Sequence, residues 1–157
     1  MKLVRKDDKA FVFEMVPDEK RLFLDVLKLY PLIPAVHRPA PRTAGAGPPP
    51  DNQKLLAEAL AERKQANQRQ LQKLLSEERP FKTVPAGCQF TLGDSQAEWL
   101  LQVVNEIRVG SWLILGEPDE KKGKPIRLNR ENARYYAAME FCDYIEMTLL
   151  DAFNRRS

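Results

Sequence analysis

Histidine and cysteine are scarce in this sequence of 157 residues, which contains one histidine and two cysteines. Metal sites and nucleophilic catalytic sites are built from clusters of such side chains. His37 stands in a proline-rich stretch, and Cys88 and Cys142 lie far apart along the chain. The sequence therefore predicts no metal site, no cofactor and no catalytic residue. An enzyme is the least favoured class and would need a carboxylate site without a recognisable motif.

Long apolar runs and a targeting segment are also missing. No stretch approaches the roughly 20 apolar residues that span a bilayer. The first eight residues, Met-Lys-Leu-Val-Arg-Lys-Asp-Asp, lack the apolar centre of a signal peptide. We therefore expect a cytoplasmic protein without membrane contact. In a reducing compartment Cys88 and Cys142 should be free thiols, with a disulfide between them as the alternative.

The net charge is small, and the charged residues do not cluster by sign along most of the sequence. The formal value is +3, and basic and acidic residues alternate along most of the chain. Nucleic-acid-binding proteins usually gather lysine and arginine on one face. The charge distribution therefore disfavours a nucleic-acid partner.

The periodicity of apolar residues predicts a mainly α single domain over residues 1–157. It indicates a bundle of about four helices with a small N-terminal β-hairpin. Residues 3–5 and 10–15 are short apolar runs with an alternating pattern, which is typical of a hairpin. Residues 88–92 fit either a short strand or an extended lead-in. Apolar residues at helical spacing predict helices over about 17–30, 51–78, 96–115 and 129–153.

The helix expected over 96–115 has apolar residues on both sides, which is typical of a central helix. Ser95 and Glu98 have the spacing of a capping box at its start. We expect solvent exposure to stay low from Trp99 to Leu115. Free exposure of Leu101 and Trp112 in a monomer would contradict this central placement, whereas exposure relieved by a symmetric partner would indicate a homodimer interface.

Residues 31–50 contain seven prolines and no acidic residue. This composition predicts a flexible, proline-rich loop, and mobility is expected over 35–50. A simple tether is the favoured interpretation, and a polyproline recognition segment is the alternative.

Five polar residues fall on or beside faces that should point into the core, namely Arg63, Asn67, Asn105, Arg108 and Glu146. An unpaired buried charge is costly, so such residues are either paired or exposed in a cleft. A buried hydrogen-bonded network that fixes helix register is the first interpretation. A ligand or anion cleft lined by the two arginines is the second, and a misjudged helix phase is the third. Both arginines are expected to meet carboxylates, with Glu146 the first candidate and Glu106 the second.

Several of these residues also carry a family resemblance. The elements are Arg63-Lys64-x-x-Asn67, Trp99-Leu100, Asn105-Glu106-x-Arg108 and Leu115-Gly116. In this order they resemble an uncharacterised bacterial family, a domain of unknown function whose genes in actinobacteria neighbour the gene for the ClpS adaptor. The resemblance covers about residues 51–153 and leaves out the loop 31–50, and Trp112 stands where the family would have a small residue. It implies no activity, and through gene neighbourhood it implies a link to regulated proteolysis.

Together these features favour a non-catalytic protein-interaction or regulatory domain. Its partner should be another protein, and a homodimer is a further option. The alternative is a module that binds a small anion or nucleic acid through a cleft lined by Arg63 and Arg108.

Overall fold

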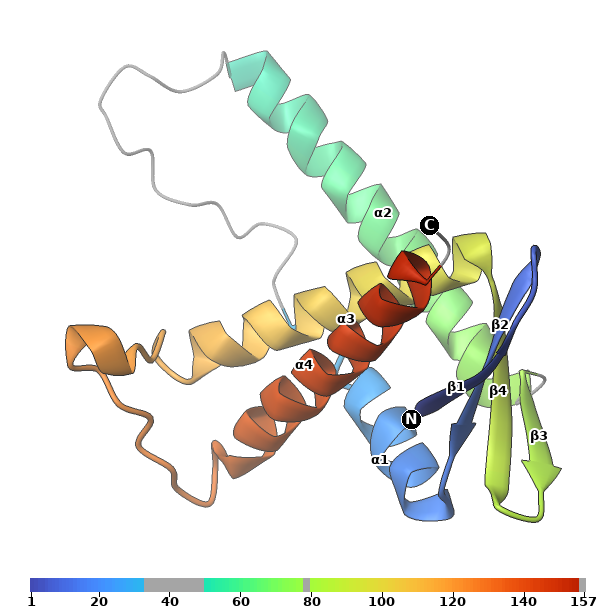
Figure 1. Ribbon diagram of the computed structural model, residues 1–157. Helices are drawn as coiled ribbons and strands as arrows, with labels where there is room; N and C mark the ends of the chain where they lie inside the picture. The colour runs from blue at the N-terminus through green and yellow to red at the C-terminus, as the bar shows by residue number, and fades with distance from the viewer. Residues whose placement is uncertain (33–49, 78–79, 156–157) are drawn as a thin grey trace.

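A computed structural model describes residues 1–32, 50–77 and 80–155 of the protein (Figure 1). Within these residues helices predominate, so the mainly helical fold class is confirmed. In chain order the elements are β1 Lys2–Lys6, β2 Ala10–Met15, α1 Pro17–Leu27, α2 Pro50–Glu77, β3 Phe81–Val84, β4 Gly87–Gly93, α3 Asp94–Ile114, the short 3-10 helix η1 Glu120–Lys122 and α4 Ala133–Asn154.

The strands form one antiparallel sheet in the order β1-β2-β4-β3. The predicted N-terminal hairpin is present as β1 and β2. The sheet is nevertheless larger than a hairpin, because β4 pairs with β2 and β3 pairs with β4. Residues 88–92 are thus part of a central strand. The sequence pattern does not predict β3, because its four residues, Phe-Lys-Thr-Val, do not alternate between apolar and polar.

The core lies between one face of this sheet and the helices. Phe11 on β2 and Phe90 on β4 have their side chains on the same face, because Phe11 is paired with Leu92 and Phe13 with Phe90. The Phe11 ring packs edge-on against Phe153 of α4, with ring centroids 5.2 Å apart. The Phe90 ring packs against Phe23 of α1 at 5.5 Å. Helices α1 and α4 therefore cover the same face of the sheet.

Helix α3 is central over most of its length but not at its end. It contacts α1, α4 and the strands β2 and β4. Leu101 is half-buried, whereas Trp112 is 38 % and Ile114 46 % exposed. The expectation of low exposure as far as Leu115 is therefore wrong for the last turn. In Figure 1 this end of α3 runs well beyond the sheet, where little surrounds it, and the Trp112 indole nitrogen donates to the carbonyl of Pro118 at 3.1 Å.

Helix α2 does not complete a four-helix bundle. Figure 1 shows its first half extending away from the other elements. Its second half packs against the rest of the chain, with Asn67 and Leu71 buried. In the first half Leu56 and Leu60 are exposed, although their spacing with Leu71 predicts one core-facing stripe. The prediction of a bundle of about four helices is thus not established, since only part of α2 lies against the other helices.

Two helix starts differ from those that the sequence pattern predicts. Helix α3 follows Gly93, whose backbone N–H donates to Oε1 of Gln96 at 2.9 Å, so the capping box expected from Ser95 and Glu98 is wrong. Helix α4 begins at Ala133, because Asn129 forms a turn instead of a cap. Its Oδ1 accepts from the backbone N–H groups of Glu131 and Asn132. In both places a nearby polar side chain satisfies the free backbone donors.

The flexible loop expected over 31–50 falls almost wholly on residues 33–49, which lie outside the described residues. Among the helices of the described part, none is both long and apolar enough to cross a membrane.

Candidate functional site

The five polar residues singled out in the sequence separate into two groups, which contact different faces of α3. The first group links α3 to α4. Arg108 Nε lies 2.7 Å from Oε2 of Glu146, and Arg108 Nη2 donates to Oδ1 of Asn105 at 2.9 Å. The Arg108 side chain is 38 % exposed and that of Glu146 17 %. Arg108 therefore does meet Glu146, at the rim of the helix pair rather than in a dry interior.

Cys142 lies beside this ion pair and is fully buried. Burial, with a contribution from the negative charge of Glu146, raises the pKa of its thiol to about 12, whereas the positive charge of Arg108 opposes the shift. Cys142 is thus a neutral thiol in the folded protein. Cys88 on β4 is also a buried free thiol, and the expected disulfide alternative is absent for these two residues.

The raised pKa of Cys142 predicts a loss of stability at alkaline pH. The unfolded thiol ionises near its ordinary pKa of 9.0, but the folded thiol holds its proton to about 12. Ionisation therefore favours the unfolded chain as pH rises above about 9. Between about pH 8 and about pH 10.5 we expect the wild type to lose about 2 kcal/mol of unfolding free energy relative to a Cys142→Ala variant.

Chemical denaturation of both proteins across this range measures the difference. The variant serves as the control, because it shares every other group that titrates at alkaline pH. Parallel pH profiles for the two proteins would contradict the prediction.

The second polar group lies between the end of α1, α2 and α3. Asn67 is buried and donates from Nδ2 to the hydroxyl of Tyr30 at 3.2 Å. Burial raises the pKa of the Tyr30 phenol; the hydrogen bond from Asn67 opposes this, and the nearby Glu106 carboxylate adds to it. Tyr30 was not among the predicted site residues. The sequence did contain a signal for it, because Tyr30 continues the apolar face of the first helix and a buried tyrosine hydroxyl needs a hydrogen-bond partner.

Arg63 is exposed and donates from Nη2 to Oε1 of Gln102 on α3. It does not lie in the core, and the side chain that it meets is an amide rather than the carboxylate expected from the sequence. The two arginines also do not share a cleft, because Arg108 faces α4 whereas Arg63 is on α2. Neither of the two cavities described below is lined by either of them.

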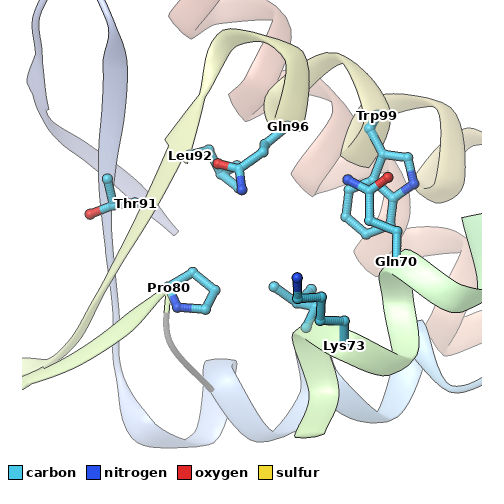
Figure 2. A pocket seen from close by; sticks show the side chains of 8 residues that line it. Gln70, Lys73, Pro80, Thr91, Leu92, Gln96 and Trp99 are labelled. Atoms are coloured by element: carbon cyan, nitrogen blue, oxygen red, sulfur yellow. The ribbon is translucent and has the colours of Figure 1, made fainter. Parts of the chain in front are cut away.

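The larger cavity lies between the second half of α2, the start of α3 and the sheet, and has a volume of about 560 Å³ (Figure 2). We call it the α2–β4 groove. Its lining combines residues from α2, β4, α3 and the position directly before β3. These are Gln70, Lys73, Leu74, Pro80, Thr91, Leu92, Gln96 and Trp99. A smaller cavity of about 270 Å³ lies between β1 and the end of α4.

The lining of the α2–β4 groove is apolar in part and rich in hydrogen-bond donors. Leu92 is fully buried, and Trp99 is 9 % exposed. The indole nitrogen of Trp99 is buried and has no hydrogen-bond partner among the described residues. Lys73 is the one charged residue of the lining, and Gln70 adds an amide. Such a surface can hold an apolar group together with a negative or acceptor group.

One wall of the groove is formed where the described part of β3 ends beside β4. β3 pairs with β4 only as far as Phe81 opposite Phe90, while β4 continues to Gly93. Beyond this point the backbone N–H of Thr91 donates to the carbonyl of Pro80 at 3.1 Å. Pro80 has no N–H to return, so the carbonyl of Thr91, which points to the same edge, receives no ladder bond from it.

The groove was not among the sites predicted from the sequence. A proline directly before a strand indicates that the hydrogen-bond ladder with the neighbouring strand is interrupted there. To locate the groove from this signal, one must also know which strand is the neighbour. Within the described residues, no group of three or more histidine, cysteine or acidic side chains is placed to hold a metal ion.

Comparisons of the chain with family models, curated proteins and solved structures found no match.

Proposed function

We propose that this chain is a non-catalytic protein-interaction domain and that the α2–β4 groove is its binding surface. The observation that carries the proposal is the composition of the groove wall. Pro80 and Thr91 of the β3–β4 hairpin, a buried apolar floor and one lysine face a common space of about 560 Å³. A protein segment presents the matching set, namely backbone amides, apolar side chains and carboxylates.

The same geometry gives less support to an anion or nucleic-acid module that uses the two arginines. Arg108 is already neutralised by Glu146, and Arg63 is engaged by Gln102 on another face. A link to regulated proteolysis is part of the proposal and depends on the family resemblance alone.

Site-specific photo-crosslinking tests the proposed surface. Benzoylphenylalanine replaces either Gln70, which lines the groove, or Gln72, which is also exposed on α2 but does not line it. In cells that express the full chain, we expect a discrete crosslinked protein from position 70 and not from position 72. Lys73→Glu in the position-70 protein should reduce that product about tenfold, because it reverses the charge of the lining. Equal crosslinking from both positions, or a product that Lys73→Glu leaves unchanged, would refute the groove as the binding surface.

A further inference from the structure

We infer that the partner of the α2–β4 groove is an acidic peptide segment that enters the groove with its side chains. A carboxylate of the segment pairs with Lys73, and an apolar side chain next to it packs against Leu74 and Pro80. An acceptor oxygen of the segment takes the indole N–H of Trp99. This inference depends on the proposed function and specifies the chemistry of the partner.

The first observation is a positive charge without a counter-charge. Lys73 is exposed and lines the groove, and in Figure 2 its amino group points away from α2 into the groove. Among the described residues no carboxylate forms an ion pair with it, and the other lining residues are uncharged. A carboxylate is the group that an ammonium favours most, and a charge pair is stronger in partly apolar surroundings than in open water.

The second observation is a hydrogen-bond donor without an acceptor. Trp99 is 9 % exposed and lines the groove, and its indole nitrogen is buried with no hydrogen-bond partner among the described residues. A buried N–H that lacks an acceptor is costly and uncommon in native proteins. Gln70 is exposed and also lines the groove, so its side chain can yield to a group that approaches Trp99. An acceptor oxygen of the bound segment then satisfies the indole donor.

The third observation is apolar surface next to these two polar groups. Leu74 and Pro80 are half-buried and line the groove together with the buried Leu92. Leu74 packs against the hydrophobic core with part of its side chain, so an apolar group of a partner can cover the rest. A cavity of about 560 Å³ is in the size range of ligand pockets, which is room for a few side chains. An apolar side chain beside a carboxylate therefore suits it.

The probe is a capped pentapeptide of glycine, leucine, glutamate, leucine and glycine, titrated into the full ¹⁵N-labelled chain. We expect it to bind at least tenfold more tightly than the same peptide with glutamine in place of glutamate, because the two differ only in the charge. The indole proton signal of Trp99 should move downfield and exchange more slowly with solvent. The indole of Trp112, which already donates to the carbonyl of Pro118, is the internal control and should not shift.

A reversal of charge tests the direct pairing with Lys73. Lys73→Glu should bind a peptide with lysine in place of glutamate at least tenfold more tightly than the wild type does, and this gain requires a folded variant. Lys54→Glu makes the same charge change on the exposed first half of α2, outside both cavities, and should alter neither affinity by more than about twofold. If Lys73→Glu weakens the glutamate peptide without improving the lysine peptide, the direct pairing is wrong.

The remaining outcomes separate this inference from the proposed function. Equal affinity for the glutamate and glutamine peptides, no binding of either, or a Trp99 indole signal that stays in place at saturation would overturn the inference. A Trp99 signal that shifts with protein concentration alone would show that a second copy of the chain fills the groove, which also overturns it. The proposed function fails only if the Lys73-dependent crosslink from position 70 is lost.

Discussion

Replacing Phe90 with alanine is expected to lower the free energy of unfolding by about 3–5 kcal/mol. The Phe90 ring is fully buried on the central strand β4. It stacks on Phe81 of β3, with centroids 4.6 Å apart, and packs edge-on against Phe23 of α1 at 5.5 Å. Removal of the ring opens a cavity where the sheet meets α1, and the neighbouring rings lose their contacts.

Urea denaturation of the wild type and the variant measures this loss. Met147→Ala is the matched control, because Met147 is 61 % exposed and its truncation should change the free energy by less than about 0.5 kcal/mol. If the alanine variant does not fold, Phe90→Leu provides a measurable substitute. It keeps most of the side-chain volume, so we expect it to lower the free energy of unfolding by less than Phe90→Ala would. A loss at Phe90 no larger than that at Met147 would show that β4 is not part of the core.

Replacing Gly87 with alanine is expected to cost about 2–4 kcal/mol for a different reason, a conflict between backbone segments. Gly87 has a φ of +140°, and a Cβ at this position would lie 2.3 Å from the carbonyl oxygen of Met15. Met15 is the last residue of β2 and is paired with Cys88. The alanine variant must therefore push β2 away from β4 or distort the turn between β3 and β4.

Gly123→Ala is the control for Gly87→Ala. Gly123 also has a positive φ, of +72°, but no heavy atom lies within 4 Å of a Cβ built there. Its replacement should cost only about 1 kcal/mol, the conformational penalty of a left-handed residue. Thermal unfolding of the two variants separates strain from steric conflict, and equal losses would contradict the close approach of β2 to β4.

Patterns among residues that are close in the sequence predicted the helices and the N-terminal hairpin. The alternation around Phe11 and Phe13 predicted the N-terminal hairpin, and helical spacing predicted the four helices near their observed bounds. The encounter of Arg108 with Glu146 was also predictable, since both residues lie beside the apolar faces through which α3 and α4 pack. In each case the spacing of residues along the sequence fixes the direction in which each side chain points from the axis of its own helix or strand.

The neighbours that cover each helix cannot be inferred from its own sequence and are known only from the folded structure. Helix α2 has 28 residues and is about 42 Å long. It therefore extends beyond the elements against which its second half packs. Leu56 and Leu71 share a predicted stripe, yet only Leu71 is buried. Arg63 is exposed for the same reason. The helical phase indicates which way its side chain points, but not whether a neighbouring element reaches far enough to cover it.

The α2–β4 groove follows the same logic. The sequence shows that residues 88–92 can form an extended segment and that Pro80 has no N–H to donate. Only the pairing of β4 with both β2 and β3 placed Thr91 opposite that proline, and the packing of α2 and α3 brought Lys73 and Trp99 to the same cavity. Strand pairing joins segments that are distant in sequence, and a single chain's local pattern does not encode which edges meet.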